Sequence, residues 1–137
     1  MNSADFETFV MALPNVQCVK NFGYSLFFVG DDHRLPFVSI AHSDNDFDNV
    51  SNLDREGVFR LNIGVSKATF NDLNSCLPDG EIDFSMVNVF LPHPHYASQH
   101  FVCILNPDGD HVVRTKQLIK EAHAIAESIH QRKKDRR

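Results

Sequence analysis

The stretch VFRLNI, residues 58–63, decides how the chain is expected to fold. Successive side chains of a β-strand point to opposite faces of a sheet, so Arg60 and Asn62 share one face with Val58. The other three residues of the stretch, Phe59, Leu61 and Ile63, are all apolar and form the other face. The apolar face predicts contact with a core, and the polar face must meet solvent, another chain or a ligand.

Similar short runs rich in Val, Phe and Ile predict further strands, with turn residues between them. These expected strands cover residues 16–20, 24–29, 37–41 and 101–105. Apolar residues at helical spacing predict helices over residues 4–13, from Ser66 to Asn74, and after the turn at residues 106–110. The segment 75–100 is expected to be mostly loop, with one short element around residues 84–90.

This order of elements predicts an α+β fold. We expect an antiparallel sheet of about five strands, with an N-terminal helix, a short middle helix and a long C-terminal helix packed on one face. The chain has 137 residues, 42% of them hydrophobic and 23% charged. These values are those of an ordinary globular domain, so we expect one domain over residues 1–131, followed by a basic tail at residues 132–137.

The termini and the charge distribution limit the expected partners. The first residues lack the basic start of a signal peptide, and no apolar run is long enough to cross a bilayer. We therefore expect a cytoplasmic protein without membrane association.

The charge distribution does not favour nucleic acid as a partner. The net charge is −5 although the RKKDRR tail is strongly basic, so residues 1–131 are acidic and repel a phosphate backbone. Weak nucleic-acid binding through the tail remains an alternative.

The acidic stretch HSDNDFDNVSNLDR, residues 42–55, resembles a calcium loop in part. Three aspartates occupy positions one, three and five of an EF-hand loop: Asp44, Asp46 and Asp48. Asn49 and Arg55, however, stand where that loop needs Gly and a bidentate Glu. We interpret the stretch as a structured loop that leads into the next strand, and leave open a weaker cation site that includes His42.

Two further groups could bind something. His93 and His95 form an HxH pair that can place both rings on one side of an extended segment. The metal-site alternative uses His93, His95, Asp44 and Asp46. An arginine on the polar face of a strand can pair with Asp54 or with an anionic ligand. The hypothetical ligand pocket consists of His42, Asp54, Arg60, Asn62 and His95.

Three segments together resemble a family of uncharacterised bacterial proteins, the domain of unknown function 6194 family. They are SNLDREGVFRLNIGVSKATF (51–70), LPHPHYASQHFVCILNP (91–107) and KEAHAIA (120–126). More distantly, the order of elements is similar to the YjbR/MmcQ group, which has a CyaY-like fold. That resemblance implies DNA binding, or iron binding through acidic residues. The acidic body of this chain departs from the first role, and the absence of an acidic helical ridge departs from the second.

We find no nucleophile elbow and no phosphate-binding glycine loop, so no catalytic residue and no cofactor are predicted. The sequence therefore favours a binding or interaction module with a small-molecule or protein partner. A metal-binding protein or small enzyme with a His/Asp pocket is the alternative.

Overall fold

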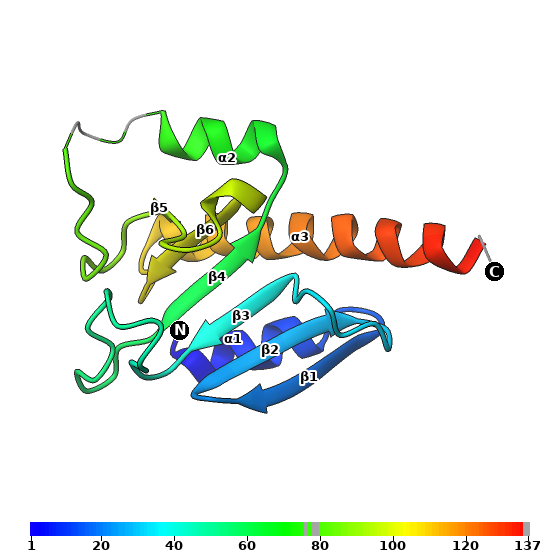
Figure 1. Ribbon diagram of the computed structural model, residues 1–137, viewed down its shortest axis with the longest axis horizontal. Helices are drawn as coiled ribbons and strands as arrows, with labels where there is room; N and C mark the ends of the chain where they lie inside the picture. The colour runs from blue at the N-terminus through cyan, green and yellow to red at the C-terminus, as the bar shows by residue number, and fades with distance from the viewer. Residues whose placement is uncertain (76, 78–79, 136–137) are drawn as a thin grey trace.

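The computed structural model describes residues 1–75, 77 and 80–135, and within these residues the chain forms one six-stranded antiparallel sheet (Figure 1). The strand order is β1-β2-β3-β4-β6-β5. In that order the strands are Val16–Asn21, Tyr24–Val29, Val38–Ala41, Arg60–Gly64, Phe101–Leu105 and Leu91–Pro92. The expected strand at residues 58–63 is thus β4, and it lies in the middle of the sheet, between β3 and β6.

Two helices cover one face of this sheet. α1 (Ser3–Met11) lies against β1, and α3 (Asp110–Asp135) crosses β2, β3 and β4 (Figure 1). The short α2 (Lys67–Asn74) lies beside β5, at the far end of the sheet from β1. We call the sheet face that α1 and α3 do not cover the open face.

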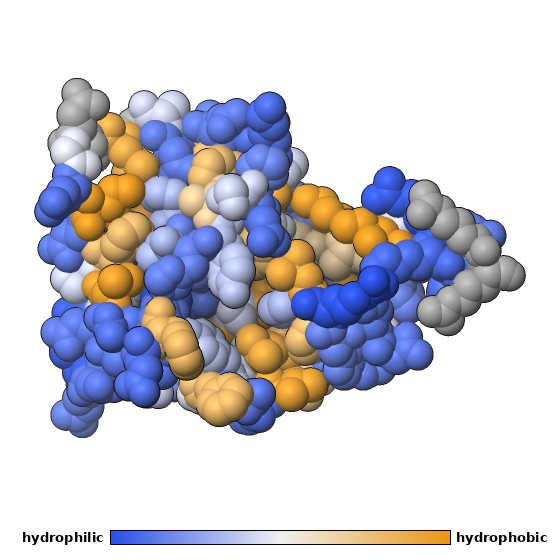
Figure 2. All heavy atoms as spheres, in the orientation of Figure 1, coloured by the Kyte–Doolittle hydropathy of each residue, from blue (hydrophilic) through white to orange (hydrophobic). Residues whose placement is uncertain are grey.

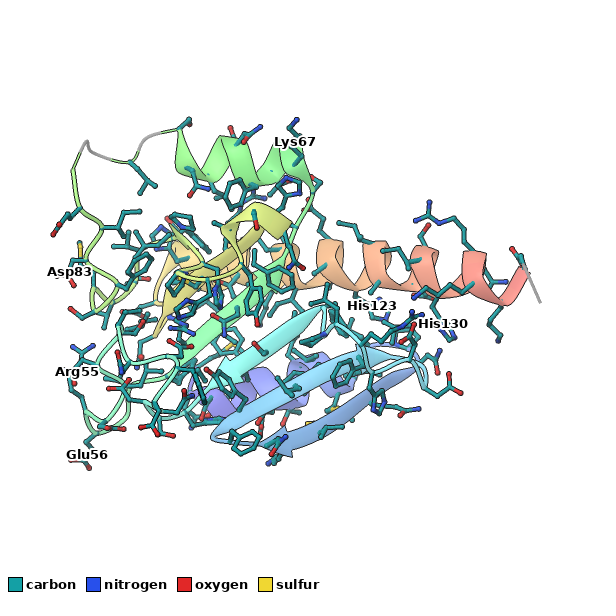
Figure 3. The ribbon with its side chains drawn as sticks, viewed as in Figure 1. Arg55, Glu56, Lys67, Asp83, His123 and His130 are labelled. Carbon is teal, nitrogen blue, oxygen red and sulfur yellow. The ribbon has the colours of Figure 1, made fainter. Side chains whose placement is uncertain are left out.

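The core lies between the sheet and these two helices. Apolar side chains of the central strands meet Phe6 and Val10 of α1 and Leu118 and Ile119 of α3, and all four are fully or almost fully buried. Burying one such side chain stabilises the fold by roughly 1.5–3 kcal/mol. His123 of α3, labelled in Figure 3, donates from Nε2 to the Pro14 carbonyl at 2.7 Å and so fixes α3 against the α1–β1 connection.

The structure confirms the α+β class and the three helices, and it adds one strand to the expected sheet. Around residues 84–90, where a short element was expected, the structure has a single parallel β-bridge, between Val87 and Leu105 of β6. The additional strand is β5, whose Leu91 and Pro92 pair with Cys103 and Val102 of β6. Pro92 has no N–H to donate, and a proline inside a sheet is therefore confined to an edge strand such as this one.

The C-terminal helix continues into the predicted basic tail. α3 includes Arg132–Asp135, and the Lys133 ammonium lies 2.6 Å from the Asp32 carboxylate on the β2–β3 connection. Arg136 and Arg137 lie outside the described residues. Among the described helices, none is both long and apolar enough to cross a membrane.

The core predicts that alanine substitutions of two phenylalanines in neighbouring segments change the free energy of unfolding by very different amounts. Phe27 is fully buried, so Phe27→Ala should lower the free energy of unfolding by about 3–5 kcal/mol, because it removes apolar contacts and leaves a cavity. Phe22 is 81% exposed, and Phe22→Ala should change it by less than about 0.5 kcal/mol. Urea unfolding of both variants measures this, and equal losses would contradict the assignment of the core.

Candidate functional site

The polar side of β4 is covered by the chain itself. Arg60 and Asn62 both point to the open face, opposite the core, yet Arg60 is fully buried and Asn62 is almost so. The loop between β3 and β4, residues 42–59, supplies the cover, because its Asp48 and Ser51 contact the Arg60 guanidinium. The polar face of the strand is therefore satisfied within the protein.

The Arg60 guanidinium is the centre of a hydrogen-bond network. Nη1 donates to Asp48 Oδ1 and to Ser51 Oγ, each at 3.0 Å, and Nη2 donates to Asp48 Oδ2. Nε donates to Asn62 Oδ1 at 2.8 Å. The contact with Asp48 is thus bidentate, the geometry for which the planar guanidinium is suited.

The network continues on both sides of this pair. Asn62 Nδ2 donates to Ser39 Oγ at 3.0 Å, across the β3–β4 pairing. On the other side, the Tyr24 hydroxyl donates to Asp48 Oδ2 at 2.7 Å and accepts from Asn45. Burial raises the pKa of Asp48, but the hydrogen bonds from Arg60 and Tyr24 outweigh burial and hold the pKa below its usual value. Asp48 therefore stays ionised beside a permanent cation.

Two other acidic residues of the loop accept hydrogen bonds from backbone N–H groups. Asp44 Oδ1 accepts from the Leu53 amide at 2.9 Å, and Asp54 Oδ1 accepts from the Asp44 amide at 3.1 Å. Such bonds close turns, which is the usual role of Asp and Asn in loops. Arg55, labelled in Figure 3, donates to the Ser85 carbonyl at 2.9 Å and fixes the loop to the segment before β5.

His93 occupies a buried position beside this network. Its Nδ1 accepts from the backbone amides of His95 and Tyr96, at 3.0 and 3.1 Å, so the neutral ring carries its proton on Nε2. Burial, together with the charge of Arg60, lowers the pKa of His93 to about 3. Among the described residues, none accepts a hydrogen bond from this Nε2–H group.

These groups line a cavity of about 820 Å³ on the open face. Its polar base consists of Ser39, Asn62, Asp48 and His93, with His95 Nε2 4.0 Å from Asp48 Oδ1. Its sides are apolar and largely aromatic: Phe22, Tyr24, Leu26, Leu35, Pro36, Phe47, Tyr96 and Phe101. Figure 2 shows apolar side chains of this kind on the face that is turned to the viewer. We call this cavity the open-face pocket.

The structure brings together three of the five residues in the predicted ligand pocket. Arg60 lies under the base of the open-face pocket, and Asn62 and His95 line it. Asp54 does not line it, and Asp48 takes the pairing with Arg60 that the sequence analysis allowed for Asp54. The grouping of His42 with Arg60 is not found, because His42 lies on the helix-covered side of the sheet.

His42 belongs to a separate cluster with Ser25 and Glu7. Ser25 Oγ donates to Glu7 Oε1 at 2.5 Å. His42 Nε2 lies 3.0 Å from Ser25 Oγ and must therefore be the donor to that hydroxyl oxygen. His42 therefore cannot accept the Ser25 proton as a general base would, and the hydroxyl is almost completely buried. The cluster holds α1 against β2 and β3.

Two of the four residues of the metal-site alternative, Asp44 and His93, have other partners. Asp44 is engaged with the Leu53 amide, and His93 uses Nδ1 for two backbone amides. In the part of the chain that the structure describes, no three His, Cys, Asp or Glu side chains are arranged to hold a metal ion.

Comparison with known proteins adds one finding. The model of a family of unknown function, DUF6194, matches residues 1–135. The chain belongs to the DUF6194 family. No curated protein and no solved structure matches it. The DUF6194 assignment agrees with the resemblance found in the sequence, but it supplies no chemistry, so the open-face pocket must be interpreted from its own residues.

The buried ion pair predicts a large effect on stability. Arg60→Met should lower the free energy of unfolding by about 3–5 kcal/mol, because Asp48 would be left buried without its cation. Arg34 pairs with Asp32 in the same bidentate manner but is 76% exposed, so Arg34→Met is the matched control and should cost less than about 1 kcal/mol. Urea unfolding distinguishes the two, and a small loss for Arg60→Met would contradict the network.

His93 predicts a specific dependence of stability on pH. The folded pKa of about 3 lies below the ordinary value of 6.5, so between these values the unfolded chain binds a proton that the folded protein does not. Stability should therefore fall as pH is lowered through this window, by up to about 1.4 kcal/mol per pH unit from this group.

In His93→Asn, the side-chain oxygen can still accept from the two backbone amides, but the titrating group is gone. The wild-type protein should thus lose more stability between pH 6.5 and pH 4 than this variant does. Unfolding curves across that range measure the difference, and parallel pH profiles would contradict a buried, neutral His93.

Proposed function

We propose that the protein is a binding module that takes a small, uncharged aromatic molecule with a hydrogen-bond acceptor into the open-face pocket. One observation carries the proposal: four large apolar side chains that are exposed to solvent line this cavity. Phe47 is 91% exposed and Phe22 81%, and the half-exposed Leu35 and Tyr96 lie with them. Exposed apolar groups concentrated around a concave surface are typical of ligand sites.

The polar base favours an acceptor on the ligand. The His93 Nε2–H group has no acceptor among the described residues, and Ser39 Oγ accepts from Asn62 and so keeps its own proton to donate. A ligand carbonyl or ring nitrogen would satisfy these donors. A hydrocarbon of the same shape would leave them unpaired, which costs binding free energy.

The charges around the pocket favour an uncharged ligand. Asp48 is neutralised by Arg60 beneath it, and Arg34 of the lining is paired with Asp32. Among the described residues, the lining therefore offers no unpaired Lys or Arg to an anionic ligand. The aromatic sides can instead stack on the faces of a planar ring.

The same contacts support binding over catalysis. Both oxygens of Asp48 already accept hydrogen bonds, and Nδ1 of His93 is occupied by two backbone amides. A general base needs a free acceptor and a pKa near the working pH, whereas the pKa of His93 is about 3. The cytoplasmic location, the bacterial source and the relation to the YjbR/MmcQ group remain predictions from the sequence.

Ligand-observed saturation-transfer NMR tests the proposal with acetophenone and its hydrocarbon isostere α-methylstyrene. The wild-type protein should bind both and prefer acetophenone. Leu26 lines the pocket from β2, so Leu26→Trp should obstruct the cavity with a bulky ring and abolish the signal. Val113→Trp is the matched control, because Val113 is an exposed residue of α3 outside the pocket, and it should bind as the wild type does.

A second variant tests the polar base. His93→Asn removes the Nε2–H donor, so it should weaken acetophenone binding by about 5–10-fold, the value of one hydrogen bond, and leave α-methylstyrene unchanged. Absence of binding by both compounds, or binding that survives Leu26→Trp, would overturn the proposal. A His93→Asn variant that keeps its preference for acetophenone would overturn the role given to His93.

A further inference from the structure

A second cavity, of about 600 Å³, lies between α3 and the chain that connects β2 to β3. We call it the α3 groove. Its lining comes from the C-terminal half of α3, from residues 34–37, and from the adjoining ends of β4 and β6. Figure 3 labels Lys67 and His130, which line the groove from α2 and from α3.

The inner surface of the α3 groove is apolar. Ile125, Ala126 and Ile129 lie on one side of α3, and Leu35 and Phe101 come from the other elements that line the groove. Ile129 is 40% exposed and Leu35 is 53% exposed, so apolar surface is left open to water along the groove. A ligand with an aliphatic chain would remove this surface from water.

The rim of the α3 groove is basic, in contrast to the protein as a whole. The chain carries a net charge of −5, whereas the charged side chains of the groove are three cations, Arg34, Lys67 and Lys133, and the single acid Asp32. Asp32 bonds to both Arg34 and Lys133, at 3.0 and 2.6 Å. The negative charge of Asp32 is therefore paired with cations at one end of the groove. The same contacts hold the pKa of Asp32 well below its usual range.

Lys67 lies at the other end of the groove and has no acidic partner among the described residues. Gln99 and His100 line the groove near it, because the end of β4 pairs with Phe101 and the Val65 amide donates to the His100 carbonyl. Glu121 does not line the groove, and its carboxylate accepts from the Ser66 amide and from Thr69 Oγ1. Lys67, an exposed residue, is therefore the cationic side chain that the lining offers at this end of the groove.

From this arrangement we infer that the α3 groove binds a free medium-chain aliphatic carboxylate. Its chain lies along Ile125 and Ile129, and its carboxylate pairs with Lys67, with His100 and Gln99 beside it. Charge complementarity selects an anionic head group, and the apolar inner surface selects an unbranched tail. The inference is independent of the proposed function, although Arg34, Leu35, Pro36 and Phe101 line both cavities.

Isothermal titration calorimetry with hexanoate, octanoate and decanoate, each below its micellar concentration, tests the inference on the full chain. Burial of each added methylene should tighten binding about fourfold. Lys67→Glu should weaken decanoate binding at least 10-fold, because it replaces a charge-assisted contact by repulsion. Ile129→Asp should abolish binding, because it places a charge in the apolar channel.

Three control variants show whether decanoate occupies the α3 groove. Lys134→Glu makes the same charge change as Lys67→Glu on a residue outside the groove, and Val113→Asp makes a change like Ile129→Asp outside it. Both should bind decanoate as the wild type does. Leu26→Trp obstructs the open-face pocket, and because Leu26 does not line the α3 groove it should also leave decanoate binding intact. Circular dichroism confirms that each variant is folded before its titration.

Several results would overturn the inference. They are no heat of binding with decanoate, no dependence on chain length, equal affinity for decyltrimethylammonium, and an equal effect of Lys67→Glu and Lys134→Glu. Loss of decanoate binding in Leu26→Trp would move the ligand to the open-face pocket. A dimer in sedimentation velocity that Ile129→Asp dissociates would also overturn it, because a second copy would then cover the groove. The acetophenone experiment tests the proposed function separately.

Discussion

The buried ion pair between Arg60 and Asp48 is the interaction on which the open side of this protein depends. Removing two charges from water costs several kcal/mol per ion, and only close, well-oriented contacts compensate for that cost. Here Arg60 donates to Asp48, Ser51 and Asn62, and Asp48 also accepts from Tyr24. The network joins β4, β3, β2 and the β3–β4 loop in one polar layer opposite the hydrophobic core.

This layer determines which functions the open-face pocket can have. A network that is already satisfied leaves few free groups, so the pocket can recognise a ligand through the His93 and Ser39 donors and its aromatic sides. The α3 groove differs from the open-face pocket in its lining and in its charge, because its inner surface is apolar and its rim is cationic. The β2–β3 connection lines both cavities through Arg34, Leu35 and Pro36, and it is held to α3 by the contact between Asp32 and Lys133.

Much of the fold could be predicted from the sequence, because alternation along β4 and helical spacing in α1 and α3 are strong local patterns. β5 could not, since it has only two residues, one of them a proline, and forms through its pairing with β6. The partner of Arg60 could not be chosen either, because several loop aspartates lie within reach of the strand and only the folded path of the loop selects Asp48. His42 could have been placed, since it follows Val38 and Ile40 at even spacing and therefore shares their core-facing side.

NMR of the Arg60 guanidinium in protein labelled with ¹⁵N-arginine tests the central claim most directly. A guanidinium that is held by Asp48, Ser51 and Asn62 and shielded from water should show resolved Nη signals and slow exchange of its Nε–H and Nη–H protons. Asp48→Asn should accelerate that exchange and shift these signals, while the other arginine side chains stay unchanged. Rapidly exchanging, averaged Nη signals for Arg60 in the wild-type protein would contradict the buried ion pair and the pocket base built on it.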